Sequence, residues 1–471
     1  MVRHLITIDD LTEQEILAIF DLADAYLANM THPDRPWRIR GGRKEADQFQ
    51  LATLFYEAST RTRFSFESAM GRLGGQVLSS ADPKTTSAAK GETLADTIRV
   101  VQNYADVVVI RHPAEGAARV VADFSEIPII NAGDGGHEHP TQTLCDLFTL
   151  RREKGTLAGI HVALWGDLKN GRTVHSLAFG LARFGAKIVS MAAPGFELPE
   201  HVTRRLKQDY DCEPITAQEF GERRLLNSPV DAAYIAPEKP HQRTLFTNVG
   251  AETAGELRER GPAALKLDAL YVTRLQRERF QAPEGHGANE TPAVPRSFDA
   301  YDVVNTQFLR ENLDAQSSVM HPLPRVEELA TEIDTDERAV YFKQAAYGVP
   351  VRMALLASVL GVRPGTLSEA PPDHRYPVTT PAGMTCRNPR CITGNEAERR
   401  YLRPKFSRLF VDRKVALRCV YCEHEQVPGW VATSPDQAVA NRDLDRIPEP
   451  HLAVFETERE AAAAGLGTAP S

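Results

Sequence analysis

The chain has 471 residues, 42% hydrophobic and 25% charged, which are ordinary values for a water-soluble globular protein. This length predicts two or three compact units. The net charge of −8 lacks the positive excess of typical nucleic-acid-binding proteins. The N-terminus has no signal-peptide pattern, and no apolar run is long enough to span a membrane. We therefore expect a cytoplasmic protein.

The predicted elements alternate between helix and strand. An amphipathic pattern at residues 13–27 predicts a first helix. Apolar runs then predict strands at residues 51–56, 106–110, 127–131, 160–165, 186–192, 269–272 and 318–321, with helical patterns between them. Such alternation predicts an α/β protein with parallel sheets covered by helices, in which ligands bind at the carboxyl ends of the strands.

The junction after the strand at residues 51–56 has an anion-binding pattern. Ser59, Thr60, Arg61 and Thr62 combine hydroxyl groups and a guanidinium with the free N–H groups of a new helix, and Arg63 adds a second guanidinium. Two cations at the positive end of a helix are unfavourable without an anion. The expected ligand is a phosphate, and the alternative is that Ser59 only caps the helix.

The C-terminal part of the sequence changes in character. Residues 363–383 are rich in Pro, Ser and Thr and predict a linker. Cys386-x4-Cys391 and Cys419-x2-Cys422 predict a structural zinc site with four thiolate ligands in a small domain at residues 384–433. Basic residues in this domain leave a nucleic-acid-binding ribbon as the disfavoured alternative. Residues 434–471 are polar, then Ala-rich, and predict a poorly ordered tail or a short loose helix.

The segment Ser59-Thr60-Arg61-Thr62-Arg63 resembles the phosphate loop of the aspartate and ornithine carbamoyltransferases. Further segments follow in that family's order, namely Lys90 to Thr97, Arg111-His112-Pro113, His139-Pro140-Thr141-Gln142, Gly166-Asp167-Leu168, Gly171 to Ser176, Thr273 to Gln276 and His321 to Arg325. The resemblance covers roughly residues 1–362. It implies two doubly wound parallel-sheet domains that face a cleft.

The resemblance also implies the domain limits. A carbamoyl-phosphate-binding domain is expected at residues 1–148, completed by a helix at 344–362, and an aspartate-binding domain at residues 149–343. Residues 236–267 are absent from similar enzymes and interrupt the second domain. We interpret them as a surface insertion rather than as an altered substrate lid.

Carbamoyl transfer needs a cradle for the leaving phosphate, polarisation of the carbonyl group and an unprotonated amine. The resemblance implies that the phosphate is bound by Ser59, Thr60, Arg61, Thr62 and Arg111, with Arg61 stabilising its departure. Thr62, Arg111 and His139 match donors to the carbonyl oxygen. Gln142 matches the residue that holds the carbamoyl NH2 group.

The amine substrate is expected to be aspartate. Arg172, Arg274 and Gln276 match the residues that bind a dicarboxylate in this family. The sequence has His321-Pro322-Leu323-Pro324 where ornithine enzymes have His-Cys-Leu-Pro, and the backbone carbonyls of Pro322 and Leu323 are expected near the amine. The implied function is aspartate carbamoyl transfer in pyrimidine synthesis. The alternatives are an ornithine-type or other transcarbamylase, or a scaffold without catalysis.

Two further expectations concern assembly and closure. Lys90, with Thr86 or Ser87, matches residues that enter the active site of a neighbouring subunit in this family, which implies a homotrimer or a multiple of one. Glu57, Arg172 and Arg279 match residues that bridge the two domains on closure.

The cysteine domain resembles the zinc domain of the regulatory chain of some aspartate carbamoyltransferases. The motifs are Cys386 to Ile392 and Leu417 to Glu423. No counterpart of that chain's nucleotide-binding domain is present in the linker, so nucleotide control has no support here. We expect one structural zinc ion and no cofactor for catalysis.

Overall fold

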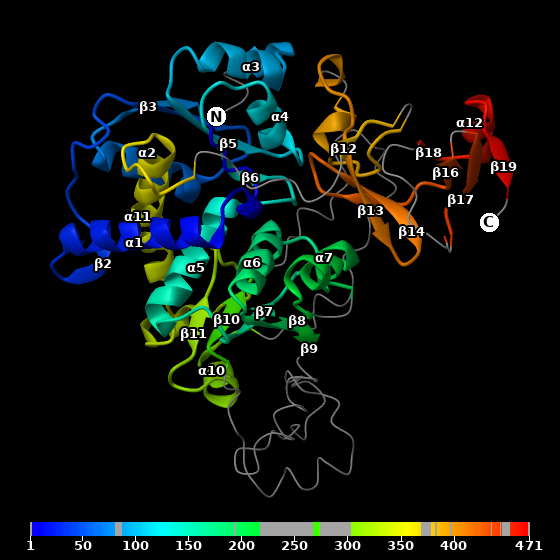
Figure 1. Ribbon diagram of the computed structural model, residues 1–471. Helices are drawn as coiled ribbons and strands as arrows, with labels where there is room; N and C mark the ends of the chain where they lie inside the picture. Colours follow the sequence, from blue (N-terminus) through cyan, green and yellow to red (C-terminus); the bar gives the residue numbers. More distant parts are fainter. Residues whose placement is uncertain are drawn as a thin grey trace, which may run out of the picture. The chain divides into compact units, whose positions relative to one another are not determined.

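The structure is a computed structural model, and it describes residues 2–80, 87–192, 195–216, 267–273, 303–368, 378–381, 384–395, 398–434, 436–442, 444 and 453–469 (Figure 1). The chain divides into two compact units. The first contains Met1–Glu15, Gly42–His139 and Leu355–Ser471, and the second contains Ile16–Gly41 and Pro140–Ala354.

The first unit is built on a four-stranded parallel sheet with the order β4-β3-β5-β6. Its strands are β3 (Gln50–Phe55), β4 (Gln76–Ser80), β5 (Val107–His112) and β6 (Ile129–Asp134). Its helices include η1 (Ile8–Asp10), α2 (Thr60–Arg72), η3 (Ser87–Lys90), α3 (Leu94–Val101) and α4 (Ala117–Asp123). After β3, the next strand in sequence, β4, pairs with one side of β3, and the strand after that, β5, pairs with the other side. The topological switch point therefore lies between β3 and β5.

The second unit contains a five-stranded parallel sheet with the order β11-β10-β7-β8-β9. Its strands are β7 (His161–Trp165), β8 (Lys187–Met191), β9 (Ile215–Thr216), β10 (Ala269–Val272) and β11 (Ser318–Met320). The switch point here lies between β7 and β10. Both sheets therefore offer the kind of crevice in which α/β proteins bind ligands.

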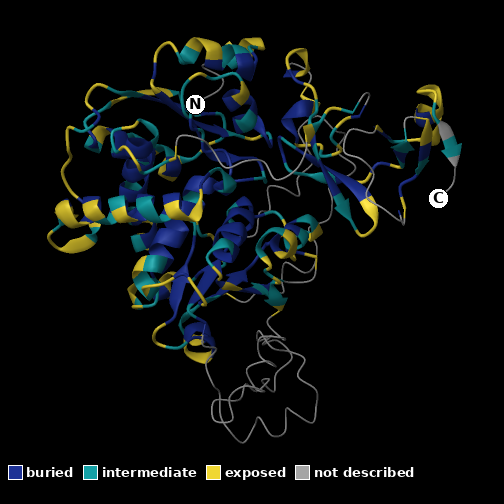
Figure 2. Cartoon of the chain, viewed as in Figure 1, coloured by how far each residue is buried: buried dark blue, intermediate teal, exposed yellow. Residues whose placement is uncertain are grey.

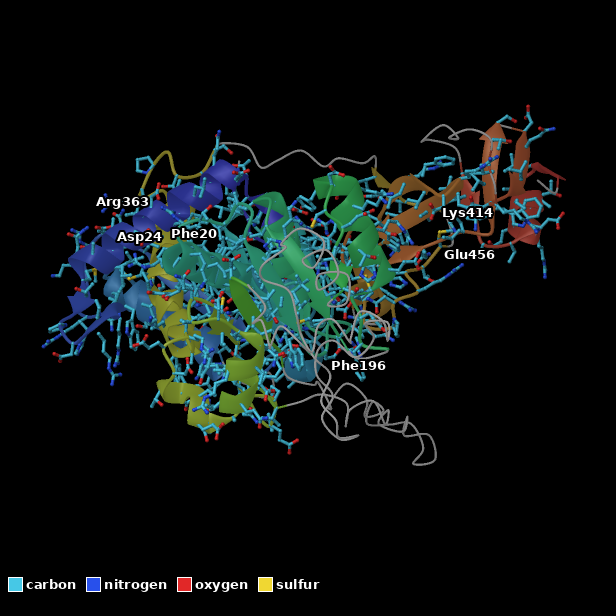
Figure 3. The ribbon with its side chains drawn as sticks, turned by 90° about the horizontal axis from the view of Figure 1, so that it is seen from below. Phe20, Asp24, Phe196, Arg363, Lys414 and Glu456 are labelled. Atoms are coloured by element: carbon cyan, nitrogen blue, oxygen red, sulfur yellow. The ribbon has the colours of Figure 1, made fainter. Side chains whose placement is uncertain are left out.

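Helices surround this second sheet. They are α5 (Pro140–Lys154), α6 (Arg172–Arg183), α7 (Glu200–Tyr210), α10 (Thr306–Asn312), η6 (Thr331–Thr335) and α11 (Tyr341–Val359), while α1 (Glu13–Asn29) precedes the short hairpin of β1 (Thr31–His32) and β2 (Arg35–Ile39). Figure 3 labels Phe20 and Asp24 on α1. Phe20 packs edge-on against Phe148 of α5, with ring centroids 5.6 Å apart, and Asp24, one turn later, forms an ion pair with Arg152.

Burial explains why these segments form strands. Val107 to Ile110 of β5 and all four residues of β10 are buried, as expected for strands covered on both faces (Figure 2). The strands predicted from the sequence at residues 51–321 are confirmed, with ends that differ by a few residues. The prediction missed β4, because this strand at the sheet edge is largely exposed and has only two apolar residues, Val77 and Leu78.

The C-terminal part of the first unit has two more sheets. An antiparallel sheet has the order β12-β13-β14-β15, with β12 (Val378–Thr379), β13 (Phe406–Val411), β14 (Lys414–Cys419) and β15 (Glu425–Gln426), beside η7 (Ile392–Gly394) and η8 (Glu398–Arg400). A second sheet has the order β18-β16-β17-β19, with β16 (Trp430–Ser434), β17 (Gln437–Ala440), β18 (Val454–Phe455) and β19 (Gly467–Ala469), and helix α12 (Glu458–Ala463).

The sequence prediction for the tail was poor order or a short helix; the short helix is present as α12, whereas the strands β17, β18 and β19 were not predicted. Ala438 and Ala461 are buried there, and Thr457 caps α12 through its side chain. Glu456, labelled in Figure 3, forms an ion pair with Arg387 of the cysteine domain. Because the segment has few apolar residues, its sequence shows no strand pattern, and its strands are stabilised by pairing with one another. The insertion at residues 236–267 lies outside the described residues except for its last residue, Leu267, which is buried.

The cysteine domain shares a hydrophobic core with the parallel sheet of its unit. Buried Val120 and Val121 of α4 belong to the same cluster as Ile392, Phe406 and Tyr421. Glu398 of η8 accepts a hydrogen bond from the N–H of Leu94, at 2.8 Å, and so serves the first turn of α3. The domain is thus packed onto α3 and α4 by apolar contact and by a carboxylate at a helix N-terminus.

Among the described helices, none combines the length and the apolar character that crossing a membrane would require.

The backbone of Gly116, just before α4, lies very close to the backbone of Tyr421 in the cysteine domain. Gly116 has φ +87°, and a Cβ placed there would lie 2.6 Å from the backbone carbon of Tyr421. Gly361 also has a positive φ, +69°, but faces open space. Gly361→Ala should cost about 1 kcal/mol of unfolding free energy through backbone strain alone. Gly116→Ala should cost about 1–3 kcal/mol more because the cysteine domain must shift. Denaturant unfolding of both variants measures the difference; equal losses would contradict this packing.

Candidate active site and metal centre

The end of β3 leads directly into the predicted phosphate loop. Ser59 occupies the N-cap position of α2, but its side chain makes no capping hydrogen bond. The first turn of α2 contains no acidic residue, while Arg61 is exposed and Thr62 is buried. The alternative in which Ser59 only caps the helix is therefore not supported. The first turn retains N–H groups, hydroxyls and a guanidinium, the donors that an anion requires.

Arg111 lies at the end of β5, the neighbour of β3 across the switch point. Its side chain is largely buried, donates to Glu57 at 2.7 Å and donates to the carbonyl of Ala132 at 3.2 Å. Glu57 thus contacts Arg111 within one unit, a pairing that the sequence did not predict. The backbone carbonyl of Arg111 also accepts from the N–H of Tyr56, at 2.8 Å. These contacts fix the guanidinium beside the residues that follow β3.

His112, the next residue, is structural. Its Nδ1 accepts a hydrogen bond from the N–H of Ala114 at 2.9 Å, and its ring lies 5.1 Å from that of Tyr56. Burial lowers the pKa of His112 to about 4, so the imidazole is neutral near pH 7.

The loop after β6 holds His139, which is 3% exposed. Buried Asp134 organises this loop by accepting hydrogen bonds from the N–H groups of Gly116, at 2.7 Å, and Glu138, at 3.1 Å. The same carboxylate pairs with Nδ1 of His137 at 3.1 Å. His139 therefore stands at the end of a loop fixed by a buried carboxylate, directly before α5 begins at Pro140.

Lys90 ends the short helix η3, which follows β4, and both Lys90 and Ser87 are exposed. Thr86, the other candidate, lies outside the described residues. The exposure of Lys90 is compatible with the predicted role in a neighbouring subunit, which no contact within this chain tests.

In the second unit, Arg172 opens α6 after β7 and is largely buried. Gly166, also in the loop after β7, lies so close to Thr273 that a Cβ would be 2.5 Å from its carbonyl oxygen. This contact brings the loop that leads to Arg172 against the end of β10, at the switch point of the sheet. Arg274, Gln276 and Arg279 lie outside the described residues.

The His321-Pro322-Leu323-Pro324 segment follows β11. Nδ1 of His321 accepts from the N–H of Leu323 at 2.7 Å, so the proton is on Nε2, which lies 2.9 Å from Glu328. Leu323 has φ +53°, an uncommon value outside glycine. The imidazole thus fixes the local backbone and with it the carbonyl groups of Pro322 and Leu323.

Gln142 belongs to the first turns of α5. Its Nε2 donates to Oδ1 of Asp146, one turn later, at 2.7 Å. Since a carboxylate accepts and does not donate, the amide oxygen of Gln142 is turned away from Asp146.

The four C-terminal cysteines form a metal-binding cluster. Their Sγ atoms all lie within 4.8 Å of one another, with Cys386 to Cys422 at 3.6 Å and Cys391 to Cys419 at 3.9 Å. Tetrahedral thiolates at a zinc–sulfur distance of about 2.3 Å would be about 3.8 Å apart. Hydrogen bonds from Cys386, Cys419 and Cys422 lower the pKa of Cys391, which favours its thiolate. The cluster fits a tetrahedral metal ion.

Both halves of this cluster contact the loops of the parallel sheet. Between Cys386 and Cys391, Asn388 donates to Glu115 at 2.6 Å, and Glu115 also accepts from the N–H of Gly136 at 3.0 Å. After Cys422, Glu423 lies 3.5 Å from Nε2 of His137. Burial opposes the charge on His137, but Asp134 and Glu423 together raise its pKa well above the usual range.

Sequence reasoning did not find this second layer of residues, Glu115, Asp134, His137, Asp146 and Glu423. Each has an ionisable side chain at a buried or half-buried position. The available signal was an acidic residue inside an otherwise apolar run, as in Leu144-Cys145-Asp146-Leu147.

Comparison with known proteins places the chain. Residues 3–152 match the carbamoyl-phosphate-binding domain, and residues 245–359 the Asp/Orn-binding domain, of aspartate/ornithine carbamoyltransferases; residues 382–427 match the metal-binding domain of the aspartate carbamoyltransferase regulatory chain. The aspartate carbamoyltransferase catalytic subunit of Thermoplasma volcanium is 40% identical over 359 residues, 76% of this chain and 98% of that one. That of Clostridium botulinum strain Loch Maree is 41% identical, over 77% of this chain and 99% of that one.

Solved structures agree. The catalytic subunit of M. jannaschii aspartate transcarbamoylase matches with a TM-score of 0.56 and 37% identity, over 77% of this chain and 99% of that chain. The Trypanosoma cruzi aspartate transcarbamoylase in complex with carbamoyl phosphate and aspartate matches with a TM-score of 0.59 and 33% identity, over 75% and 95%. This chain therefore belongs to the aspartate carbamoyltransferase family and carries, in the same polypeptide, a metal-binding domain of the regulatory-chain type.

Proposed function

We propose that the chain transfers the carbamoyl group of carbamoyl phosphate to the amine of L-aspartate, giving N-carbamoyl-L-aspartate and phosphate for pyrimidine synthesis. The observation that carries this proposal is the first turn of α2, which has no acidic residue and no side-chain cap, at the switch point between β3 and β5, where Arg111 ends β5. The similarity of the chain to named aspartate carbamoyltransferases indicates that the amine substrate is aspartate. The cytoplasmic location expected from the sequence stays a prediction.

The reaction assigns a task to each group. The unprotonated amine nitrogen attacks the carbonyl carbon, a C–N bond forms, and negative charge develops on the carbonyl oxygen, which Thr62, Arg111 and His139 stabilise. The C–O bond to phosphate then breaks, and the nitrogen loses a proton, which the phosphate carries away. Arg61, with Ser59 and Thr60, takes up the charge that grows on the phosphate. Gln142 holds the carbamoyl NH2 group through its amide oxygen.

Aspartate is held by its two carboxylates. Arg172, Arg274 and Gln276 supply the donors, and the backbone carbonyls of Pro322 and Leu323 orient the amine. The imidazole of His321 supports this by fixing the backbone of Leu323. A guanidinium forms two parallel hydrogen bonds with a carboxylate, so two arginines select a dicarboxylate over ornithine, whose side chain is cationic.

Lys90, with Thr86 or Ser87, completes the site of a neighbouring subunit in a homotrimer. The exposed position of Lys90 supports this role. On closure, Glu57 exchanges its present partner Arg111 for Arg172 and Arg279, which bridges the two domains.

The metal is zinc, held by Cys386, Cys391, Cys419 and Cys422. Four thiolates leave no open coordination position, so the ion has a structural task. When bound, zinc supplies the cross-link that holds the two cysteine pairs together. The contacts of Asn388 and Glu423 with the loops around Glu115 and His137 then give the domain a scaffolding role.

Arg61→Ala tests the phosphate site. The variant should lose roughly 3 kcal/mol or more of transition-state stabilisation, at least about 100-fold in kcat/KM, without a loss of fold. The control is Arg72→Ala, at the far end of the same helix, where Nε of the guanidinium donates to the hydroxyl of Ser68 at 3.2 Å. Phosphate release is measured with carbamoyl phosphate and either aspartate or ornithine. Turnover of Arg61→Ala within threefold of the parent would refute its role, and a preference for ornithine would refute the substrate.

Mixing experiments test the shared site. Lys90→Ala and Arg61→Ala should each be inactive alone, and mixtures that exchange subunits should regain activity, because some interfaces then combine an intact Lys90 with an intact Arg61. Mass spectrometry confirms exchange, and each variant mixed with itself is the control. Exchange without recovery would show that each chain forms a complete site.

Metal removal tests the scaffold. Metal analysis should find one zinc per chain, and Cys419→Ser or a chelator should lower the thermal midpoint by more than about 5 °C, because the metal-free domain no longer holds its packing. Cys212→Ser, a lone half-buried thiol, should leave zinc content and midpoint unchanged. A stable, zinc-free Cys419→Ser protein would contradict the structural role.

A further inference from the structure

Asp146 occupies the centre of α5 and has no exposed surface. Its carboxylate accepts three hydrogen bonds from three different segments. Oδ1 accepts from Nε2 of Gln142, at 2.7 Å, and from Nε2 of Gln344, at 2.6 Å. Oδ2 accepts from the hydroxyl of Tyr271, at 2.8 Å.

Each donor belongs to a segment that the proposed function uses. Gln142 is the residue assigned to the carbamoyl NH2 group. Tyr271 lies near the end of β10, just before Thr273 and Arg274. Gln344 of α11 turns its Oε1 to the N–H of His321, at 2.9 Å, and so holds the segment that supplies the carbonyls of Pro322 and Leu323.

Burying a carboxylate at this position costs desolvation free energy. Burial raises the pKa of Asp146 to about 7, although hydrogen bonds from Gln344, Tyr271 and Gln142 and the charge of Arg352 act in the opposite direction. Apolar side chains of similar volume usually replace buried charges without loss of stability. The stability of α5 therefore does not explain an acidic residue here, whereas the orientation of its three donors does.

We propose that Asp146 is a positioning residue for carbamoyl transfer. It orients the amide of Gln142 so that the amide oxygen faces the carbamoyl NH2 group, and it holds the side chains of Tyr271 and Gln344 in fixed positions relative to that amide. The inference rests on the proposed function. In its ionised form, which predominates above its pKa of about 7, the carboxylate can only accept, so Nε2 of Gln142 faces it and Oε1 faces away. The amide of Gln344 is oriented in the same way, because its nitrogen donates to Asp146 and its oxygen accepts from the N–H of His321.

Asp146→Asn tests the inference because it keeps the shape and removes the acceptor-only character. An Asn side chain adds an NH2 donor, which can bond to the amide oxygen of Gln142, so the amide of Gln142 is free to turn over. The variant should retain its secondary structure and assembly and lose at least 30-fold in kcat. A double-mutant cycle with Gln142→Ala gives the decisive readout. If Asp146 acts through Gln142, Asp146→Asn should cost less than threefold in the Gln142→Ala background.

Thr149→Val is the matched control on the same helix. The buried hydroxyl of Thr149 donates to the backbone carbonyl of Cys145 at 2.7 Å. Its loss should lower stability and change kcat by less than twofold. An equal, multiplicative loss from Asp146→Asn in both backgrounds would overturn the inference and leave the proposed function standing. A parent without carbamoyl transfer would overturn both.

Tyr271→Phe covers the case in which Asp146→Asn does not fold. It removes the donor to Oδ2 and leaves the bond between Gln142 and Oδ1 intact. The expected result is a rise of threefold or more in the KM for aspartate, with the KM for carbamoyl phosphate within twofold of the parent. An unchanged KM for aspartate would overturn the inference.

Discussion

The placement of strand ends governs where this chain can do chemistry. In each parallel sheet all strands finish at one edge, and the order of strands reverses once, between β3 and β5 in one sheet and between β7 and β10 in the other. Backbone N–H groups and side chains therefore converge at these two positions of the described parallel sheets. Arg111 and the first turn of α2 occupy the first, and the approach to Arg172 lies at the second. The remaining described structure supports these two edges.

Support comes from buried carboxylates rather than from the apolar core alone. Asp134 gathers backbone and imidazole donors around the loop that ends at His139, and Glu115 links that loop to Asn388 of the cysteine domain. Carboxylates suit this task because they accept several hydrogen bonds without donating any, so their donors have one possible orientation. Their desolvation is costly, which explains why each is surrounded by multiple partners.

The sequence was sufficient for the alternation of strands and helices, the start of α2 at the Ser59 to Thr62 segment and the grouping of the four cysteines, because each of these is a local pattern. It was insufficient for β4, whose edge position replaces apolar residues with polar ones, and for the ordered tail, whose strands depend on pairing with distant strands. The hydrogen-bond partners of Asp134 and Asp146 could not be predicted from the sequence either. Residues such as Tyr271 and Gln344 meet Asp146 only after the chain has folded, and nothing in their local sequence marks them.

Covalent linkage of the cysteine domain to the sheet it packs against changes the kind of equilibrium that governs their association. The matching domain family is named for a regulatory chain, and docking of such a domain from a separate chain would be bimolecular and would depend on protein concentration. Here the linker makes it intramolecular, with an effective concentration that dilution does not alter. The contacts of Glu398 with α3 and of Glu423 with His137 can therefore be individually modest and still remain formed at low protein concentration.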